Sequence, residues 1–442
     1  MCGIVGFTGE HQAAPILLDG LSKLEYRGYD SAGLAVRDGE NLAQVVKAKG
    51  RLSNLAEKTD DGHTLKGTCG IGHTRWATHG EPSQTNAHPH VSGNCSGSGS
   101  GMVESEVVGV HNGIIENYTE LKEKLLKHGY TFYSQTDTEV VIKLVDYYYK
   151  KYNLGPIDAI AKTMVRVRGS YALELMFKDY PGEIWVARKD SPMIIGIADG
   201  ETYVASDVPA ILKYTRNVYY IGNLEFAKLT PGEAHFYNLD GDEIEKETTE
   251  IKWDAEAAEK AGFEHFMMKE IHEQPKAILD TFSPRIKGND IVIEELGMSD
   301  EEIKAIRKIM IVACGSAYHA GVTAKYVMEG MARIPVETDL ASEFRYRDPI
   351  MGDGTLVVII SQSGETADSL AALREAKQRG AKVLGIVNVV GSSIAREADN
   401  VMYTWAGPEI AVATTKAYSS QLIALYLLAM KFAFVRGKIT DS

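Results

Sequence analysis

Residues 1–9 of the chain read MCGIVGFTG, a short apolar run with a cysteine in second place. Removal of Met1, which is usual when the next side chain is small, makes Cys2 the first residue. Its thiol and its free α-amine then belong to one residue, and an amine with a pKa of about 8 can take the proton of the thiol. The stretch therefore predicts an N-terminal nucleophile or, as the plain alternative, a cysteine that merely precedes a first strand.

The composition of the chain is that of an ordinary globular protein. Its 442 residues suggest two to four domains, and 44% of them are hydrophobic and 24% charged. Lys and Arg total 47 against 60 Asp and Glu, a formal charge of −13. This acidic balance argues against nucleic-acid and membrane partners. A small anionic substrate remains compatible with it, because backbone N–H groups can hold a phosphate.

Four widely scattered cysteines give no CxxC pair and no zinc spacing, so we expect neither a metal nor another cofactor. They are Cys2, Cys69, Cys95 and Cys314. The start of the chain lacks the pattern of a secretory signal. Residues 419–437 are apolar but interrupted by Ser, Gln and Lys, which favours a buried core helix over a membrane span. Together these features predict a cytoplasmic protein.

The first 240 residues predict a layered α+β domain. Short apolar or alternating runs, broken by Gly, Asp and Asn, are typical of strands joined by turns. Helical spacing of apolar residues marks 11–30 and 137–152 as amphipathic helices. Strands with helices interposed irregularly indicate layers of sheet and helix. The Gly/Ser-rich stretch 92–106, which includes Cys95, predicts a flexible surface loop.

The composition changes twice after residue 240. Residues 241–275 are charged and helical in pattern, and Pro275 is expected to end that helix, so 241–285 is interpreted as an interdomain connector. Beyond it, runs rich in Val and Ile alternate with helical segments. Such alternation predicts a doubly wound α/β domain with a parallel sheet over 286–442.

If Cys2 is a nucleophile acting on an amide, its partners should include an oxyanion hole and a clamp for the charges of the substrate. Asn112 with Gly113 offers an amide donor and an open backbone N–H, while Arg75 and Asp137 offer opposite charges. Each also has an ordinary explanation. HNG can be a turn, Arg75 a surface ion pair, and Asp137 or Thr136 a helix N-cap.

Taken in order, six motifs make a specific set. MCGIVG, YRGYDSAG, GHTRWATHG, NAHPH, HNGIIEN and TDTE resemble the glutaminase domain of the glucosamine-6-phosphate synthases, also called glutamine–fructose-6-phosphate aminotransferases (isomerising). The resemblance covers residues 2–240 and implies an N-terminal-nucleophile hydrolase fold with layers α/β/β/α. It also implies that glutamine is hydrolysed through a thioester on Cys2 and that the ammonia is destined for fructose 6-phosphate.

The resemblance assigns roles to particular residues. Cys2 would be the nucleophile, Asn112 and Gly113 the oxyanion hole, Arg75 the partner of the glutamine α-carboxylate and Asp137 the partner of its α-ammonium. Three further positions would line the site or close over it: Trp76, Thr78 and His88.

Two loops of the C-terminal region predict a second site. CGSAYHAG (314–321) and SQSGET (361–366) each follow an apolar strand and open a helix, where backbone N–H groups and hydroxyls can hold a phosphate. A structural turn is the alternative, and no P-loop lysine or GxGxxG motif supports a nucleotide. With NVVGSSIAREAD (388–399) the loops resemble the sugar isomerase (SIS) domain of the same family. That resemblance implies phosphosugar contacts by Ser316, Ala317, Ser361, Gln362, Ser363 and Thr366.

Members of the family carry a second SIS domain and a C-terminal tail that have no counterpart here. We therefore expect a complete glutaminase joined to an incomplete synthase half, with glutamine and fructose 6-phosphate as partners and a homodimer or other self-association. Two alternatives stay open: glutaminase activity alone, and a non-catalytic phosphosugar-binding or regulatory protein. A phosphoribosyl amidotransferase is disfavoured because its acidic loop is not seen whereas SQSGET is present.

Overall fold

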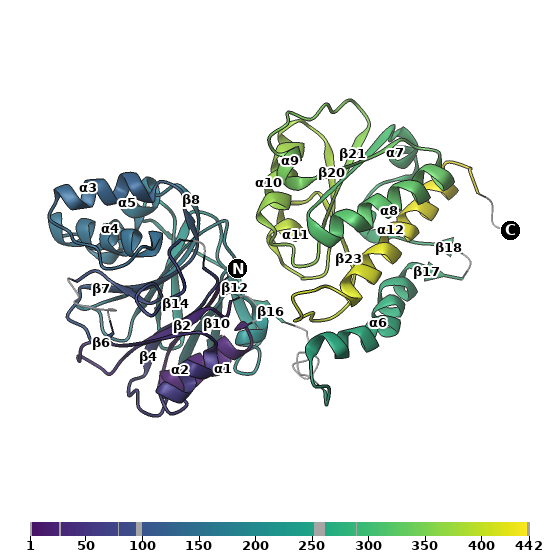
Figure 1. Cartoon of the computed structure of the whole chain (residues 1–442). Helices are drawn as coiled ribbons and strands as arrows, with labels where there is room; N and C mark the ends of the chain where they lie inside the picture. The colour runs from purple at the N-terminus through teal and green to yellow at the C-terminus, as the bar shows by residue number, and fades with distance from the viewer. Residues whose placement is uncertain are drawn as a thin grey trace. The chain divides into compact units, whose positions relative to one another are not determined.

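The structure is a computed structural model that describes residues 2–25, 28–77, 79–93, 100–251, 261–288 and 290–439. The chain divides into two compact units, Met1–Ala255 and Glu256–Ser442. Figure 1 shows the sheets and helices of each unit.

The N-terminal unit contains two antiparallel sheets. The nine strands of the first follow the order β16 (Thr249–Glu250), β12 (Asn217–Tyr220), β10 (Ile194–Ala198), β11 (Glu201–Ala205), β1 (Gly3–Thr8), β4 (Cys69–Arg75), β2 (Ser31–Arg37), β3 (Gln44–Lys49) and β6 (Gly101–Met102). The seven strands of the second follow the order β15 (Glu243–Ile244), β14 (Glu233–Tyr237), β13 (Glu225–Thr230), β9 (Ile184–Lys189), β8 (Gly169–Phe177), β7 (Val107–Ile115) and β5 (His90–Val91).

Helices cover the outer face of each sheet. The first sheet packs against α1 (Ala13–Ser22) and α2 (Leu52–Lys58), with η2 (Val208–Ala210) beside them. The second packs against α3 (Tyr118–Lys127), α4 (Asp137–Lys151) and α5 (Pro156–Arg166). The predicted α/β/β/α layers are confirmed. Helix α1 takes only residues 13–22 of the longer helix predicted over 11–30.

Strand β1 shows why the layers form. Val5 and Phe7 belong to the core under α1, whereas Ile4 belongs to the core between the two sheets. Side chains alternate between the faces of a strand, so an apolar run such as CGIVGF can bury both faces. Strand β1 therefore lies in the interior of its sheet between β4 and β11, and residue 2 precedes this central strand.

A carboxyl group, that of Glu174, lies between the two sheets. Glu174 of β8 is fully buried, and both of its carboxyl oxygens lack a hydrogen-bond partner among the described residues. Gly6 of β1 leaves room for it, because a Cβ there would come within 3.0 Å of Oε2. Burial raises the pKa of Glu174 well above its usual value of 4.5. The apolar layer around the carboxyl therefore favours its neutral form.

The C-terminal unit is built on a five-stranded parallel sheet in the order β20 (Val336–Leu340), β19 (Lys308–Ala313), β21 (Thr355–Ser361), β22 (Lys382–Val387) and β23 (Asn400–Tyr403). One face packs against α7 (Asp300–Ala305), α8 (Gly315–Ala332) and α12 (Lys416–Val435). The other packs against α9 (Ala341–Phe344), α10 (Ala367–Gln378) and α11 (Ser393–Glu397). The predicted doubly wound parallel sheet is confirmed.

The remaining elements of this unit precede the sheet in the chain. They are α6 (Phe266–Phe282), η4 (Ser283–Arg285), β17 (Ile286–Lys287), β18 (Asp290–Ile291) and η5 (Glu294–Leu296). Helix α12 is long and apolar enough to cross a membrane, judged by length and composition alone. However, 56% of its most apolar stretch is buried inside the protein. It packs against α8 and α6 as a core helix.

The prediction that Pro275 ends the connector helix is wrong. Helix α6 continues through Pro275 to Phe282. Proline lacks the N–H that would have reached the carbonyl of Ile271, but the side-chain amide of Gln274 donates to that carbonyl instead, at 3.1 Å. The orphaned acceptor is thus satisfied. Packing of α6 against α12 favours continuation of the helix, and Ala277 and Thr281, which follow the proline, are buried.

Replacing Glu174 by glutamine should stabilise the protein more and more as the pH rises. The pKa of Glu174 is higher in the folded than in the unfolded protein, where it is about 4.5. Its contribution to the free energy of unfolding is therefore fully present below pH 4.5 and is lost as the pH rises toward the folded-state pKa. Glu174→Gln removes that loss, worth about 1.4 kcal/mol for each pH unit in this window. Urea unfolding of both proteins at several pH values measures it. A difference that stays constant from pH 5 to 7 would contradict the neutral buried carboxyl.

Candidate active site and phosphosugar loops

Cys2 immediately precedes β1 and contacts the segment just after β4 and a residue of β7. The backbone N–H of Trp76, just beyond β4, donates to the Cys2 sulfur at 3.3 Å, and the thiol lies 3.6 Å from the carbonyl oxygen of the same residue. On β7, the side-chain amide of Asn112 donates to the Cys2 carbonyl oxygen at 3.0 Å. The predicted nucleophile and the predicted oxyanion-hole residue therefore lie in contact.

The electrostatic surroundings of the thiol act in opposite directions. Desolvation raises the pKa of Cys2, while the Trp76 N–H and the positive charge of Arg75 pull it down, and the net shift is upward. A thiol with a raised pKa needs a base to become a nucleophile at neutral pH. The free α-amine that removal of Met1 would create is such a base.

A close backbone packing fixes the segment after β4. A Cβ on Gly28 would lie 2.5 Å from the carbonyl carbon of Arg75, so only glycine allows this approach. Next to it, the carboxylate of Asp30 accepts a hydrogen bond from the N–H of Ala77, and the N–H of Asp30 donates to the Arg75 carbonyl at 3.1 Å. The GYD part of the YRGYD motif thus shapes the loop that touches the thiol.

Arg75 is buried at the end of β4, and its guanidinium bonds to backbone carbonyls. It donates to the carbonyls of His79, Gly80 (3.0 Å) and Glu81 (3.4 Å). Within the described part of the chain, no carboxylate forms an ion pair with it. The surface ion pair considered for Arg75 is not observed there. These bonds hold the guanidinium in place.

Gly113 follows Asn112 in β7 and has a backbone conformation that requires glycine. Its φ is +141°, and a Cβ there would lie 2.1 Å from the Ser170 carbonyl oxygen on the neighbouring strand β8. HNG is part of a strand in this fold, so the turn considered for it is not formed.

Asp137 is the first residue of α4, and Thr136 is the N-cap. The Thr136 hydroxyl accepts a hydrogen bond from the N–H of Glu139, which settles which of the two residues caps the helix. Asp137 Oδ2 accepts the N–H of Ile115 at 2.9 Å and lies 4.0 Å from His111 Nδ1. The acidic side chain therefore lies nearly buried beside β7, the strand that also carries Asn112.

Four buried histidines lie close together on or next to β4, β5 and β7: His73, His88, His90 and His111. His88 stacks on His73 with ring centroids 4.0 Å apart, and His90 lies 5.0 Å from His88. The N–H of His111 approaches His88 Nδ1 at 3.5 Å. Burial lowers the pKa of each of the four, well below 6.5 for His73, His88 and His90. Burial therefore favours the neutral form of each ring.

The predicted phosphosugar residues lie on two adjacent loops of the C-terminal unit. Strands β19 and β21 are parallel neighbours with Ala313 opposite Ile360, so the loops that follow them leave the same edge of the sheet. Ser361 Oγ lies 2.9 Å from Thr366 Oγ1 and accepts the N–H of Gly364 at 3.0 Å. Gln362 and Ser363 are half-buried between them. On the first loop, Ser316 is exposed and Ala317 is buried in the first turn of α8.

Several residues near the predicted site were not predicted from the sequence. Asp30 shapes the loop at the thiol, and Ser206 accepts the N–H of Ile4 at 2.9 Å next to the nucleophile. Asn86 and Glu139 belong to the motifs NAHPH and TDTE, and this membership is the feature of the sequence that could have marked them as site residues. Two predicted positions, Thr78 and Cys95, lie outside the described residues. Residues 94–99 of the Gly/Ser-rich stretch also lie outside the described residues. Of the rest, 100–102 and Glu104 are exposed, whereas Ser92 and Ser105 are buried.

The fold and the two loop sets define a class of protein, a glutamine amidotransferase unit followed by an SIS unit. Family models match residues 95–213 as a glutamine amidotransferase domain and residues 302–431 as an SIS domain. The chain belongs to the glutamine–fructose-6-phosphate aminotransferase [isomerizing] family. It is 56% identical to the member from Caldanaerobacter subterraneus subsp. tengcongensis and 55% identical to that from Clostridium acetobutylicum. Each match covers 100% of this chain and 70% of the relative.

Two solved structures show weaker likenesses. The C-terminal domain of glucosamine-fructose-6-phosphate aminotransferase from Francisella tularensis is 43% identical, with a TM-score of 0.40, over 41% of this chain and 51% of that chain. Glutamine phosphoribosylpyrophosphate amidotransferase from B. subtilis is 19% identical, with a TM-score of 0.43, over 91% of this chain and 90% of that chain.

The buried histidines should make the protein less stable in mild acid. Their folded-state pKa values are depressed, so the unfolded chain binds more protons as the pH falls through about 6.5, and stability is lost below that value. Each histidine contributes up to about 1.4 kcal/mol per pH unit. Urea unfolding between pH 8 and 5 should show the decline, and His111→Asn should make it shallower. A midpoint independent of pH in this range would contradict the neutral cluster.

Proposed function

We propose that the N-terminal unit hydrolyses glutamine at Cys2 and that the ammonia serves to convert fructose 6-phosphate to glucosamine 6-phosphate. The observation that carries the proposal is the contact of the Cys2 thiol with the Trp76 backbone and of the Cys2 carbonyl with the Asn112 amide, beside a buried guanidinium. Family membership supports the overall reaction.

Glutamine would be held by its two α-substituents. The Arg75 guanidinium, anchored by three backbone carbonyls, would take the α-carboxylate, and Asp137 would take the α-ammonium. Desolvation lowers the pKa of Arg75, but a guanidinium stays protonated in proteins. The two opposite charges lie close enough to influence each other, which suits an amino acid whose charges share one carbon.

The chemistry would begin with the thiol of Cys2. The α-amine of the processed chain takes the thiol proton, and the sulfur attacks the carboxamide carbon, whose oxygen becomes an anion. The Asn112 amide and the Gly113 N–H would stabilise that anion. When the C–N bond breaks, the nitrogen takes the proton and leaves as ammonia. Water then attacks the γ-glutamyl thioester, releasing glutamate and the thiol. Trp76, Thr78 and His88 would line or cover the bound glutamine.

In the C-terminal unit, the loop 361–366 would hold the phosphate and hydroxyls of the sugar. Ser361, Gln362, Ser363 and Thr366 follow β21, with Ser316 and Ala317 on the neighbouring loop. We further propose the functional division 2–240, 241–285 and 286–442, a cytoplasmic location and a homodimer.

The test is an assay of the purified chain with glutamine, with and without fructose 6-phosphate, in which glutamate and glucosamine 6-phosphate are measured separately. Glutamate should form, and Cys2→Ala should lower its rate at least 1,000-fold because the nucleophile is lost. Cys69→Ala is the matched control, since Cys69 is buried in the core and its pKa is raised to about 12.

The pattern of products separates the alternatives. Glutamate with glucosamine 6-phosphate supports the full reaction, and glutamate alone supports a glutaminase that does not aminate the sugar. If no glutamate forms, the amidotransferase proposal fails, and a non-catalytic phosphosugar-binding protein becomes the better account.

A further inference from the structure

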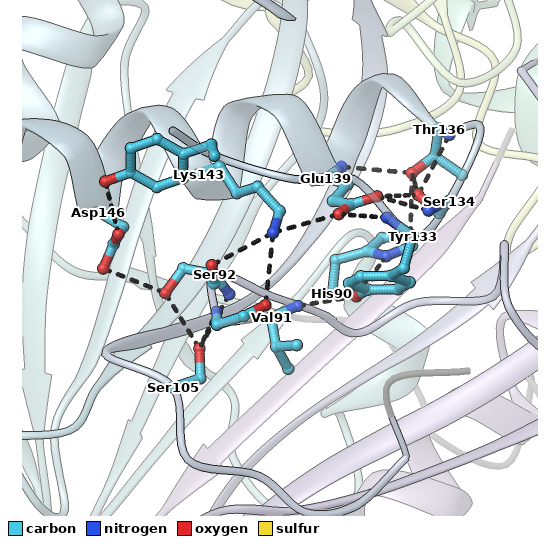
Figure 2. A network of polar contacts seen from close by, with 12 residues as sticks. His90, Val91, Ser92, Ser105, Tyr133, Ser134, Thr136, Glu139, Lys143 and Asp146 are labelled. Atoms are coloured by element: carbon cyan, nitrogen blue, oxygen red, sulfur yellow. Dashed lines mark hydrogen bonds and ion pairs between the residues drawn. The ribbon is translucent and has the colours of Figure 1, made fainter. Parts of the chain in front are cut away.

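Two of the sequence motifs contain residues that the proposed reaction leaves unused. NAHPH supplies Asn86 and His90, and TDTE supplies Glu139. All three are buried, and all three contact the turn of residues 133–136 that leads into Asp137. Figure 2 shows the contacts of His90 and Glu139 with this turn and with α4.

Glu139 organises this turn from within the helix. One carboxylate oxygen accepts the N–H of Tyr133 at 3.0 Å, and the other accepts the N–H and the hydroxyl of Ser134, both at 2.7 Å. The ammonium of Lys143, one helical turn further on, lies 3.4 Å from the first oxygen. Neither side chain is exposed, so the ion pair replaces water as the partner of the carboxylate.

Asn86 bonds to the same turn from the opposite side. Its Oδ1 accepts the N–H of Gln135 at 3.0 Å, and its amide nitrogen lies 3.3 Å from Gln135 Oε1. Its amide also donates to the carbonyl of Glu81 at 3.0 Å. That carbonyl is one of the three that hold the Arg75 guanidinium. Asn86 therefore joins the loop that anchors Arg75 to the turn that presents Asp137.

His90 adds a third constraint on the turn. Its Nε2 lies 3.0 Å from the hydroxyl of Thr136, the N-cap residue, and its Nδ1 lies 2.9 Å from the hydroxyl of Tyr133. The backbone N–H groups of residues 133, 134 and 135 are thus all satisfied by buried side chains, and the residue before Asp137 is fixed as well. A turn constrained in this way has little freedom to move.

The α-carboxylate and α-ammonium of an amino acid are attached to the same carbon. The two side chains that bind these substituents must therefore keep a fixed separation. A misplacement of about 1 Å in a binding group can cost two orders of magnitude in rate. We propose that Asn86 and Glu139 are positioning residues that set the separation of Arg75 from Asp137, and so make the site selective for amides that carry both charges. This inference rests on the proposed glutaminase function.

The test compares glutamine with glutaramate, the same amide without the α-amino group, by ammonia release from the purified chain. In Asn86→Ala and Glu139→Gln we expect the kcat/KM for glutamine to fall at least tenfold, mostly through KM. The kcat/KM for glutaramate should fall by a clearly smaller factor, because that substrate uses Arg75 but not Asp137. The ratio of kcat/KM for glutamine to kcat/KM for glutaramate should therefore drop, whereas general damage to the fold would lower both values equally.

Glu106→Gln is the matched control, since Glu106 pairs with Lys150 of the same helix at 3.5 Å and lies outside the network. It should leave both substrates unchanged. Should the buried Glu139→Gln protein fail to fold, Asn86→Ala, a loop substitution, decides alone. Equal losses for both substrates, or no loss for either, would overturn the positioning role. Wild-type protein that releases no ammonia from glutamine would overturn the proposed function and, with it, this inference.

Discussion

The site depends on the placement of β1 between β4 and β11. Gly3 lies opposite Thr74 in this pairing, so the residue before β1 meets the segment just after β4. The thiol of Cys2 consequently contacts the Trp76 backbone, and Arg75 enters the same region from the end of β4. A shift of the register by one residue would turn every side chain of β1 to the other face. The apolar layers on both sides of β1 make such a shift costly.

The second requirement is that charged and polar groups remain ordered inside an apolar sandwich. The protein meets it by giving the buried groups backbone partners. Arg75 bonds to loop carbonyls, Asp137 to the Ile115 N–H, and Glu139 to the turn before α4. Buried polar groups stabilise a single arrangement only when their bonds are satisfied. Glu174 has no such partner among the described residues, and its burial favours the neutral form instead.

Local patterns in the sequence predicted an α+β domain followed by a parallel α/β domain. The α/β/β/α layers and the roles of the site residues followed from the family resemblance of the motifs, and those roles stay predictions. Alternation and apolar runs predicted the strands, and the ordered motifs predicted that Cys2, Arg75, Asn112 and Asp137 act together. What they could not supply was contact between distant segments. That Asn86 links the Arg75 loop to the turn before Asp137 depends on tertiary packing, which no spacing encodes. The helix through Pro275 was missed for a similar reason, because a side chain replaced the lost backbone bond.

The central claim is that Cys2, held against Trp76 and Asn112, is the nucleophile of a glutamine site. Labelling with a chloroketone analogue of glutamine, followed by peptide mass mapping, tests it most directly. The account predicts one adduct per chain, located on Cys2 and prevented by excess glutamine, while Cys69 and Cys314 stay unmodified. An adduct on another cysteine, or labelling of Cys2 that glutamine does not slow, would contradict it.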